Sequence, residues 1–477
     1  MKINGKNISL VTADSRKVIP GCLFVAVKGF AGDGHAYIPQ AVEKGAAVVM
    51  YDADTLAPEV EAALAKVTAI KVDDSRLALA QAADEFYDHP SSKLKLVGIT
   101  GTNGKTTTVT LLHQLFMNLG YNCGLLSTIA NYAGKRETET TNTTSDPVTI
   151  NRLMADMVNE GCEYCFMEVS SIGMEQQRVA ALHFAAGIFS NLTHDHLDYH
   201  KTFAEYLRCK KLFFDGLGSD AVAITNIDDK NGKVMVQNTA ARVVTYALGA
   251  MADHNCRIME ESFDGMLLKI DGEEVWTRLI GRHNAYNLLA IYTTALELGA
   301  TKEEALVGIS KLDSAKGRLE TLKGPRNLSV ILDYAHTPDA LENVLSTLKD
   351  IAKDGQQVIA VFGCGGDRDR TKRPEMAAVA EKYADRIIIT SDNSRSEKTE
   401  DIIAEIKTGL SARGLAKALS IADRAEAIRT AIMTAPDGAA ILLAGKGHET
   451  YQIIGTEHRH FDEREVVRDV FNSIEAI

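Results

Sequence analysis

The chain has 477 residues, of which 45% are hydrophobic and 24% are charged, and its formal net charge is −12. This length accommodates two to four domains, and the composition is ordinary for a globular protein in water. The acidic balance, without a basic run or tail, argues against a general nucleic-acid binder. No apolar run reaches the length of a membrane span, and the first seven residues lack the apolar segment of a signal peptide. We therefore expect a cytoplasmic protein that is not membrane-embedded.

The N-terminal part of the chain alternates strand and helix patterns. Apolar runs at 23–27 and 46–50 predict strands, and a helical pattern at 38–44 lies between them. A second helical pattern at 76–87 ends before a His-Pro-Ser-Ser stretch, which is typical of a linker. We therefore expect a small α/β domain over residues 1–92.

A glycine-rich turn follows the next apolar run, residues 95–99. The turn reads Gly101-Thr102-Asn103-Gly104-Lys105-Thr106-Thr107, and a helical pattern begins behind it. Such a turn directs backbone N–H groups and a helix N-terminus at a polyphosphate, while its lysine contacts the β/γ-phosphates and its hydroxyl binds Mg²⁺. The general pattern of phosphate-binding loops, Gly-x-x-x-x-Gly-Lys-Ser/Thr, has its first glycine six residues before the lysine, and that position is Ile99 in this chain. The glycine spacing here is therefore tighter than in the general pattern. A turn that binds nothing is the alternative, but the lysine and hydroxyls favour a nucleoside triphosphate site.

Strands and helices continue to alternate beyond this turn. Such alternation predicts a parallel sheet with helices on both faces. The expected strands are 123–127, 164–169, 186–191 and 221–226, and, beyond a break near 322–327, also 330–333, 358–362, 386–390 and 440–444. We therefore expect a central P-loop ATPase domain with a mostly parallel sheet at 93–323. A Rossmann-like, doubly wound domain should follow at 324–477.

Several polar side chains lie at the ends of the expected central strands. Glu168 ends one strand, where a carboxylate serves Mg²⁺ in an NTPase, although a surface or capping glutamate fits the motif equally well. The segment 191–200 contains His194, His196 and His200 with two aspartates, and it could bind a cation, relay protons or be a polar loop. Lys210 lies in the helical pattern 204–214 and by itself is an ordinary surface lysine.

The seven cysteines give no clear metal site. Only Cys162 and Cys165 are close in sequence, and a single C-x-x-C pair without a second pair or histidines is weak evidence for zinc. The pair runs into an apolar segment, so we interpret these cysteines as buried thiols in a reducing compartment.

Four polar loops follow the four strands of the expected C-terminal domain. They span 333–338, 363–370, 392–395 and 445–449, and each contains a glycine, an arginine or an acidic residue. Ligands bind at this edge of open α/β sheets, so four such loops together predict a binding site. Residues 281–287 open a further helix; their amides could contact a purine, but a helix cap is the simpler interpretation.

Together these segments resemble the Mur ligase family, most of all its UDP-N-acetylmuramoyl-tripeptide synthetase type, over nearly the whole chain. Residues 12–16 and 21–26 resemble the uridine-nucleotide domain of that type. The segments that resemble its central ATPase domain are 101–107, 140–147, 168–173, 195–200 and 281–287. The segments that complete the match are 317–320, 333–338, 363–374 and 445–449.

The resemblance implies ATP and Mg²⁺ as cofactors and a role for each matched residue. Lys105 and Thr106 would hold the phosphates and Mg²⁺, with Glu168 on one cation. His196 and Lys210 would serve the second cation, Lys210 as an anionic N-carbamate. The residues implied for the nucleotide are Gly101, Thr102, Asn103, Gly104, Thr107, Asn287, Arg318 and Asp333. Those implied for the UDP-muramoyl dipeptide are Ser15, Thr143, Thr144, Ser170, Gln176 and Arg178, and those for the incoming amino acid are Arg368, Asn393, Arg395, Gly445 and Glu449.

The implied reaction is ATP-dependent amide formation. The γ-carboxylate of D-Glu in UDP-MurNAc-L-Ala-D-Glu would form an acyl phosphate, which an amine then attacks. Arg395, in Asp-Asn-Ser-Arg, resembles the Asp-Asn-Pro-Arg of enzymes that add meso-diaminopimelate, with Ser394 in place of proline. A guanidinium can bind the distal carboxylate of that amino acid bidentately, so we predict meso-diaminopimelate rather than L-lysine, in a monomeric enzyme.

Three other interpretations compete with this one. Folylpolyglutamate synthase shares the fold and the ATP site, but it lacks a uridine-nucleotide domain, so residues 1–92 argue against it. A catalytically inactive partner subunit is disfavoured because Lys105, Thr106, Glu168, His196 and Lys210 are all retained. A P-loop kinase or motor ATPase would hydrolyse ATP without these substrates.

Overall fold

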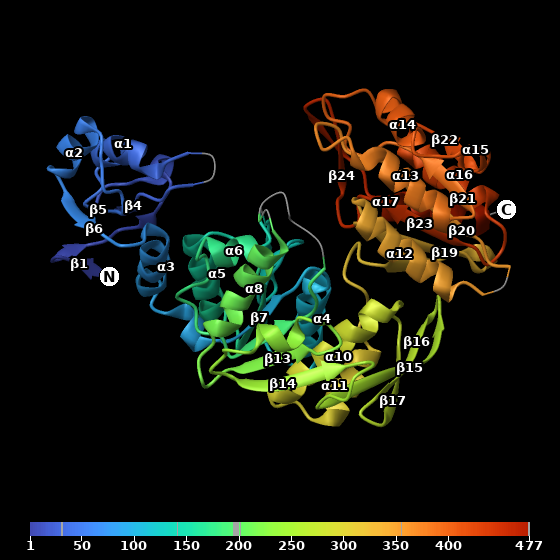
Figure 1. Cartoon of the computed structure of the whole chain (residues 1–477), viewed down its shortest axis with the longest axis horizontal. Coiled ribbons are helices and arrows are strands. Elements are labelled where there is room, and N and C mark those ends of the chain that lie inside the picture. The colour runs from blue at the N-terminus through green and yellow to red at the C-terminus, as the bar shows by residue number, and fades with distance from the viewer. Residues whose placement is uncertain (30–31, 141, 194–199, 201, 354, 476–477) are drawn as a thin grey trace. The chain divides into compact units, whose positions relative to one another are not determined.

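The computed structural model describes residues 1–29, 32–140, 142–193, 200, 202–353 and 355–475. They form two compact units, one of residues 1–255 with 287–308 and one of residues 256–286 with 309–477 (Figure 1). Within the described residues, every helix is too short or too polar to cross a bilayer.

The first unit begins with a small parallel sheet. Its strand order is β3 (Val11–Thr12), β4 (Leu23–Val25), β5 (Val48–Tyr51) and β6 (Thr68–Lys71). Phe24 on one face packs with α1 (Ile38–Glu43) and α2 (Pro58–Leu64), whereas Leu23 and Val25 on the other face pack with α3 (Ser75–Phe86). Antiparallel β1 (Lys2–Ile3) and β2 (Lys6–Asn7) precede this sheet. The predicted strands and helices of this region are confirmed, with ends shifted by up to two residues.

A larger sheet forms the rest of the first unit. Six neighbouring strands in its middle are parallel, and an antiparallel hairpin of two further strands lies at one edge. The first two residues of β15 (His254–Ser262) pair with β14. The order is β10 (Arg136–Thr138), β9 (Asn131–Ala133), β8 (Cys123–Leu126), β11 (Tyr164–Glu168), β7 (Lys95–Thr100), β12 (Ala186–Phe189), β13 (Val222–Asn226) and β14 (Arg242–Ala247).

Helices cover both faces of this larger sheet. Side chains alternate along β11, so Tyr164 and Phe166 meet Phe116 of α4 (Lys105–Asn118), with ring centroids 4.6 and 5.3 Å away. Cys165 and Met167 instead join the core formed with α5 (Pro147–Asn159) and α8 (Phe203–Asp215). Further helices of this part are α6 (Ser171–Glu175), α9 (Gly232–Met235), α10 (Arg282–Glu297) and α11 (Lys302–Ser310). The expected parallel sheet between two helical layers is therefore present.

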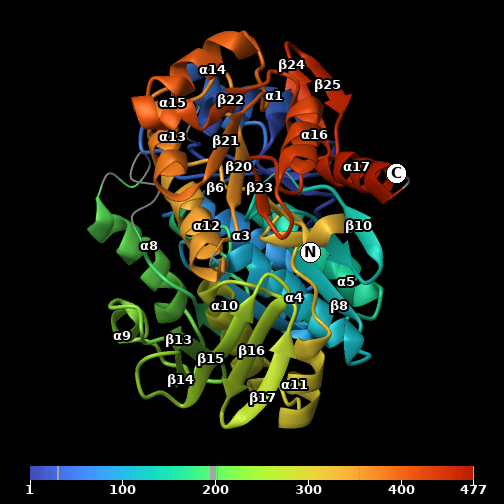
Figure 2. The same cartoon turned by 90° about the vertical axis from the view of Figure 1, so that its right-hand side faces the viewer.

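The second unit contains a doubly wound sheet. Its order is β18 (Glu320–Lys323), β19 (Ser329–Asp333), β23 (Ala440–Ala444), β20 (Val358–Phe362), β21 (Arg386–Ile389) and β22 (Ala418–Ser420). All neighbours are parallel except β18 with β19. One face packs with α12 (Pro338–Ile351), α13 (Lys372–Tyr383) and α14 (Thr399–Lys407), and the other with α16 (Arg424–Thr434) and α17 (Glu463–Glu475) (Figure 2). This confirms the predicted Rossmann-like sheet.

Two antiparallel elements of the second unit are absent from the sequence predictions. β15 pairs with β16 (Gly265–Ile270), which pairs with β17 (Glu273–Thr277), and β24 (Tyr451–Ile454) pairs with β25 (Glu457–His460). β25 is exposed throughout, β15 and β17 mix exposed and buried residues, and Lys269 interrupts the apolar run of β16. None of them therefore forms the continuous apolar run that predicts a doubly buried strand. Asp264-Gly265 and Asp271-Gly272 are hairpin signals in this stretch, and the second turn has φ of 44° and 91°.

Candidate active site

The glycine-rich turn joins β7 to α4, as expected. Gly104 has φ +88°, and a Cβ there would lie 2.5 Å from Oδ1 of Asn287. Asn103 N–H donates to Oδ1 of Asn191 at 3.0 Å, and Ser190 Oγ donates to the Asn103 carbonyl at 2.7 Å. The end of β12 therefore braces the turn. The first N–H groups of α4 have no earlier carbonyl within the helix, and they can bind an anion.

Two lysines far apart in sequence meet at the carbonyl of Gly101. Lys105 Nζ donates to this oxygen at 2.9 Å and to the Thr102 carbonyl at 2.8 Å. Lys210 Nζ, on α8, donates to the same Gly101 oxygen at 2.7 Å and lies 4.6 Å from the centroid of the Tyr206 ring. Lys210 is only 1% exposed, so it is a buried residue rather than an ordinary surface lysine. The turn thus concentrates two positive charges at a predicted phosphate site.

A hydroxyl and a carboxylate meet beside these lysines. Thr106 Oγ1 donates to Oε2 of Glu168 at 3.0 Å, and the N–H of Thr128 donates to Oε1 of Glu168 at 2.8 Å. Both Thr106 and Glu168 are buried. Oxygen ligands of this kind are those that Mg²⁺ prefers, so the two side chains fit a magnesium ion. The capping role left open for Glu168 is filled elsewhere, because Ser170 Oγ accepts from Gly173 N–H and caps α6.

Five of the six predicted substrate residues of the first unit form one network around the end of β11. Thr144 Oγ1 donates to the Glu168 carbonyl at 2.9 Å and accepts from Ser170 N–H at 3.0 Å. Arg178 donates to the Thr144 carbonyl and, through Nε and Nη2, to Oε1 of Gln176. Thr143 Oγ1 accepts from Thr128. Ser15 lies outside this network, next to the small N-terminal sheet, where it donates to Gln40.

In the second unit, a buried lysine organises two of the four polar loops. Lys446 Nζ donates to Oε2 of Glu449 at 3.0 Å and to Oδ1 of Asn393 at 3.2 Å, while Asn393 Nδ2 donates to the same Glu449 oxygen at 3.0 Å. Gly445 has φ +116°, and its N–H donates to the Asp333 carbonyl at 3.0 Å. The loops after β19, β21 and β23 therefore meet at one edge of the sheet, as predicted.

Four predicted residues lie in the segments at this edge. Arg395 Nη1 donates to the Gly366 carbonyl at 2.9 Å, whereas Arg368 is exposed. Asp333 accepts from the N–H groups of Leu319 and Ala335, and burial raises the pKa of its carboxyl although the Arg318 charge opposes this. The Arg318 guanidinium lies 5.3 Å from the centroid of the Tyr334 ring.

Three family models match successive parts of the chain. They describe the Mur ligase family catalytic domain at residues 7–87, the Mur ligase middle domain at 99–295 and the Mur ligase glutamate ligase domain at 317–447. A protein of Cytophaga hutchinsonii named UDP-N-acetylmuramoyl-L-alanyl-D-glutamate–2,6-diaminopimelate ligase is 49% identical over 468 residues, which cover 98% of this chain and 95% of that protein. The chain belongs to the Mur ligase family.

Solved structures agree with this assignment. A structure titled as a UDP-N-acetylmuramoyl-L-alanyl-D-glutamate–2,6-diaminopimelate ligase matches this Mur ligase with a TM-score of 0.72 and 29% identity, covering 100% of this chain and 98% of the other. A MurF ligase from Thermotoga maritima, titled as a complex with ADP, matches with a TM-score of 0.61 and 17% identity, over 97% of each chain, and shows the shared fold.

The sequence predictions for this Mur ligase divide into three groups. The structure brings Gly101, Lys105, Thr106, Glu168 and Lys210 together in the first unit. In the second unit it gathers the described loop residues 333, 393, 395, 445 and 449 at one sheet edge. His196, with its neighbours 194–199, lies outside the described residues.

Other residues of the Mur ligase site escaped the sequence reasoning. Lys446 is fully buried between Asn393 and Glu449, and Thr128 fixes Glu168 through its N–H. Ser190 and Asn191 brace the glycine-rich turn. The signal for Lys446 was its place between two glycines directly after an apolar strand, whereas a backbone donor such as Thr128 leaves no sequence signal.

Proposed function

We propose that this Mur ligase joins meso-diaminopimelate to the D-Glu γ-carboxylate of UDP-MurNAc-L-Ala-D-Glu, using ATP and Mg²⁺. The observation that carries the proposal is the assembly of Lys105, Thr106 and Glu168 at the N-terminus of α4. It supplies an ammonium group, helix N–H groups, a hydroxyl and a carboxylate, which together suit a triphosphate with its cation. The names of the full-length relatives supply the acceptor and the amino acid.

In this proposal the glycine-rich turn binds the phosphates of ATP. Lys105 leaves the Gly101 and Thr102 carbonyls for phosphate oxygens, and its charge stabilises the negative charge that develops during phosphoryl transfer. Glu168, fixed by the Thr128 N–H, and Thr106 would hold Mg²⁺. When bound, Mg²⁺ would neutralise phosphate charge and polarise the γ-phosphoryl group.

Lys210 would act together with His196 at a second cation. Two ammonium groups that share the Gly101 carbonyl repel each other, and N-carbamylation of Lys210 would replace one positive charge with an anionic oxygen ligand. We propose that form for the active enzyme.

The UDP-muramoyl dipeptide and the incoming amino acid would bind to different loops. Thr143, Thr144, Ser170, Gln176 and Arg178 surround the carbonyl end of β11 and would bind the UDP-muramoyl dipeptide, with Ser15 at its uridine end. Arg395, Asn393 and Glu449 would bind the amino acid, with Arg368 and Gly445 beside them. Arg318, Asp333 and Asn287 would complete the nucleotide site. We retain the three expected domains, 1–92, 93–323 and 324–477, and a monomeric, cytoplasmic enzyme.

The test of this function is phosphate release with ATP, Mg²⁺ and UDP-MurNAc-L-Ala-D-Glu, with meso-diaminopimelate or L-lysine added in parallel. Turnover with diaminopimelate alone supports the proposal. Turnover with lysine alone keeps the ligase but rejects the amino acid. No phosphate release with either amino acid favours an inactive partner subunit. Phosphate release from ATP without UDP-MurNAc-L-Ala-D-Glu and without an amino acid favours an unrelated ATPase.

The role of Arg395 is tested separately. Arg395→Ala should raise KM for meso-diaminopimelate at least about tenfold, because a charge-assisted bidentate pair contributes about 1.5–3 kcal/mol. KM for ATP should not change. Arg413→Ala removes an exposed arginine of α15 (Ala412–Ala416) and serves as the matched control. An unchanged KM for diaminopimelate in Arg395→Ala would reject this assignment.

A further inference from the structure

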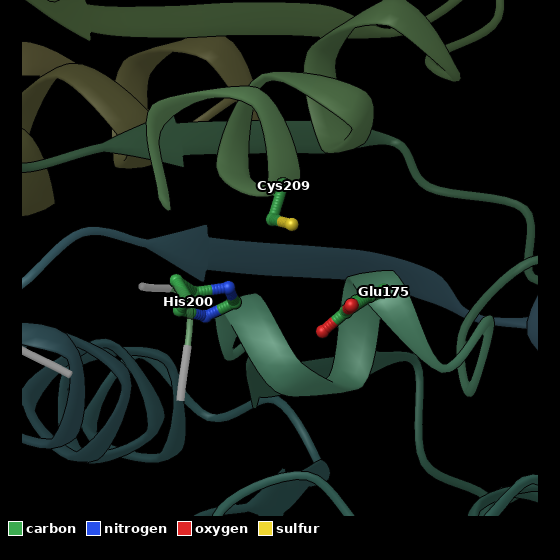
Figure 3. A group of neighbouring side chains, drawn as sticks. All are labelled: Glu175, His200 and Cys209. Atoms are coloured by element: carbon green, nitrogen blue, oxygen red, sulfur yellow. The ribbon is translucent and has the colours of Figure 1, made fainter. Parts of the chain in front are cut away.

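Three side chains of metal-binding type meet next to the proposed phosphate site. Glu175 is the last residue of α6, Cys209 lies on α8, and His200 precedes α8. One ligand atom from each lies within 4.8 Å of the others. Figure 3 shows Cys209 extending from its helix toward the space that His200 and Glu175 border. Among the described residues, this triad is the group of histidine, cysteine and acidic side chains whose spacing suits a metal ion.

Neighbouring groups hold the His200 ring and the Cys209 sulfur in place. The Nε2 atom of His200 lies 2.8 Å from Ser171 Oγ, and such an outer hydrogen bond fixes the ring orientation in metal sites. The Cys209 thiol donates to Oε1 of Glu205 at 3.6 Å, and the Arg208 guanidinium lies 3.8 Å from the same sulfur. A guanidinium at this position favours the thiolate, which is the form that binds metals.

Glu175 supplies a separate reason to expect a cation. Its Oε2 atom is buried and has no hydrogen-bond donor among the described residues. A buried carboxylate oxygen without a donor is costly, and a bound cation would remove that cost.

We propose that Glu175, His200 and Cys209 bind one zinc ion, with water as the fourth ligand. One nitrogen, one sulfur and one carboxylate oxygen form a set that Zn²⁺ accepts and that Mg²⁺, which takes oxygen ligands, does not. Binding breaks the S–H bond of Cys209, forms a Zn–S bond and releases the proton to solvent, without any redox change. The ligand atoms would move closer by about 1 Å, since zinc bonds are about 2.0–2.3 Å long.

The site would tie α6 to α8 beside the proposed catalytic groups. Cys209 precedes Lys210 in the chain, and Ser171, which holds His200, follows Ser170. Zinc would therefore stabilise this corner of the first unit, and it should raise the melting temperature of the full-length protein. This binding does not depend on the ligase reaction, so it can be measured without any substrate.

The test uses full-length, metal-free protein in excess Mg²⁺, which fills sites made of oxygen ligands. Co²⁺ is added as a spectroscopic probe for thiolate coordination, and Zn²⁺ then displaces it. We expect one equivalent of Co²⁺, a thiolate charge-transfer band, and an increase in melting temperature on adding Zn²⁺. Cys209→Ser should abolish the band, and Glu175→Gln should weaken Zn²⁺ binding at least about tenfold.

Two control variants separate the triad from its surroundings. Cys162→Ser removes another buried cysteine, one of the C-x-x-C pair, and should leave the band and the affinity as in the wild type. Glu205→Gln removes the carboxylate that accepts from Cys209 but is not part of the triad, and should change the affinity less than about threefold. A wild type without the band, a band that survives in Cys209→Ser, or unchanged affinity in folded Glu175→Gln would overturn the proposal.

Discussion

The hydroxyl of Thr106 donates a 3.0 Å hydrogen bond to Oε2 of Glu168, although 62 residues separate the two in the chain. The contact joins the first turn of α4 to the end of β11 and is buried from solvent. It places the two oxygen groups that the resemblance assigns to Mg²⁺ within reach of one ion.

Thr106→Val keeps the side-chain volume but removes the hydroxyl from this pair. We expect turnover to fall about 100-fold or more, which is typical when a group that stabilises transition-state charge is lost. Thr106→Ser should retain most of the activity. Thr110→Val is the control, because this hydroxyl of the same helix has no hydrogen-bond partner among the described residues. The assay is phosphate release over a range of Mg²⁺ concentrations, and equal rates for Thr106→Val and wild type would contradict the assignment.

Gly104 combines a left-handed backbone with a close neighbour. Gly104→Ala should lower the free energy of unfolding by about 1–2 kcal/mol for the backbone alone and should weaken nucleotide binding, because its Cβ would meet Asn287 at 2.5 Å. Gly120→Ala tests the backbone effect by itself, since Gly120 has φ +95° with nothing within 4 Å of its Cβ position. Urea unfolding and nucleotide titration compare the two. Equal nucleotide affinity in both variants would show that the Asn287 contact does not matter.

Arg424 and Glu463 form a fully buried ion pair in the second unit. Arg424 also donates to the carbonyls of Ser391 and Ala444, which lie just before the polar loops at 392–395 and 445–449. Glu463→Leu should lower the free energy of unfolding by about 3–5 kcal/mol, because it leaves a buried charge uncompensated. The double variant Arg424→Met/Glu463→Leu should recover much of that loss.

Denaturant unfolding of both variants measures these changes. Glu457→Gln breaks the exposed pair with Arg459 and should leave the unfolding midpoint unchanged. A small effect of Glu463→Leu, similar to that of Glu457→Gln, would mean that the buried pair does not brace these strands.

His448 makes stability depend on pH. Burial, followed by the charges of Arg318 and Arg464, lowers the pKa of its imidazole to about 4. An unfolded histidine has a pKa of about 6.5, so between pH 6.5 and 4 the unfolded chain binds more protons, and the free energy of unfolding falls as pH falls. The total loss is about 3 kcal/mol below pH 4, and the group contributes no pH dependence above pH 7.

His448→Gln removes this titration. Denaturant unfolding of the wild type and the variant at several pH values between 4 and 7 should give a shallower pH slope for the variant. Parallel slopes would show that the imidazole keeps an ordinary pKa.

The strands predicted from continuous apolar runs are all present, because both faces of each are covered. All five residues of β20, for example, are buried between the two helical layers. The strands that were missed include β6, β14, β15 to β17 and the β24–β25 hairpin. They are partly exposed, and their alternating or polar sequences resemble those of loops. Continuous apolar runs therefore predicted the strands that are buried on both faces, but they did not predict the strands at the surface.

The local chemistry of the phosphate site was contained in the sequence. Gly101 to Thr107 are contiguous, and a strand, a turn and a helix are enough to place their N–H groups and hydroxyls. The full set of motifs along the chain also identified the family, since each motif matches at its own position in the chain order.

Only the tertiary structure decided which distant side chains meet. Lys105 and Lys210 share the Gly101 carbonyl, Lys446 is buried between Asn393 and Glu449, and Glu175 lies beside His200 and Cys209. Periodicity along a helix or strand determines which face is apolar, but not which other element packs there. Burial and partners set the charge state and ligand geometry of a lysine or cysteine, so their roles depend on how α6, α8 and the sheet edges pack.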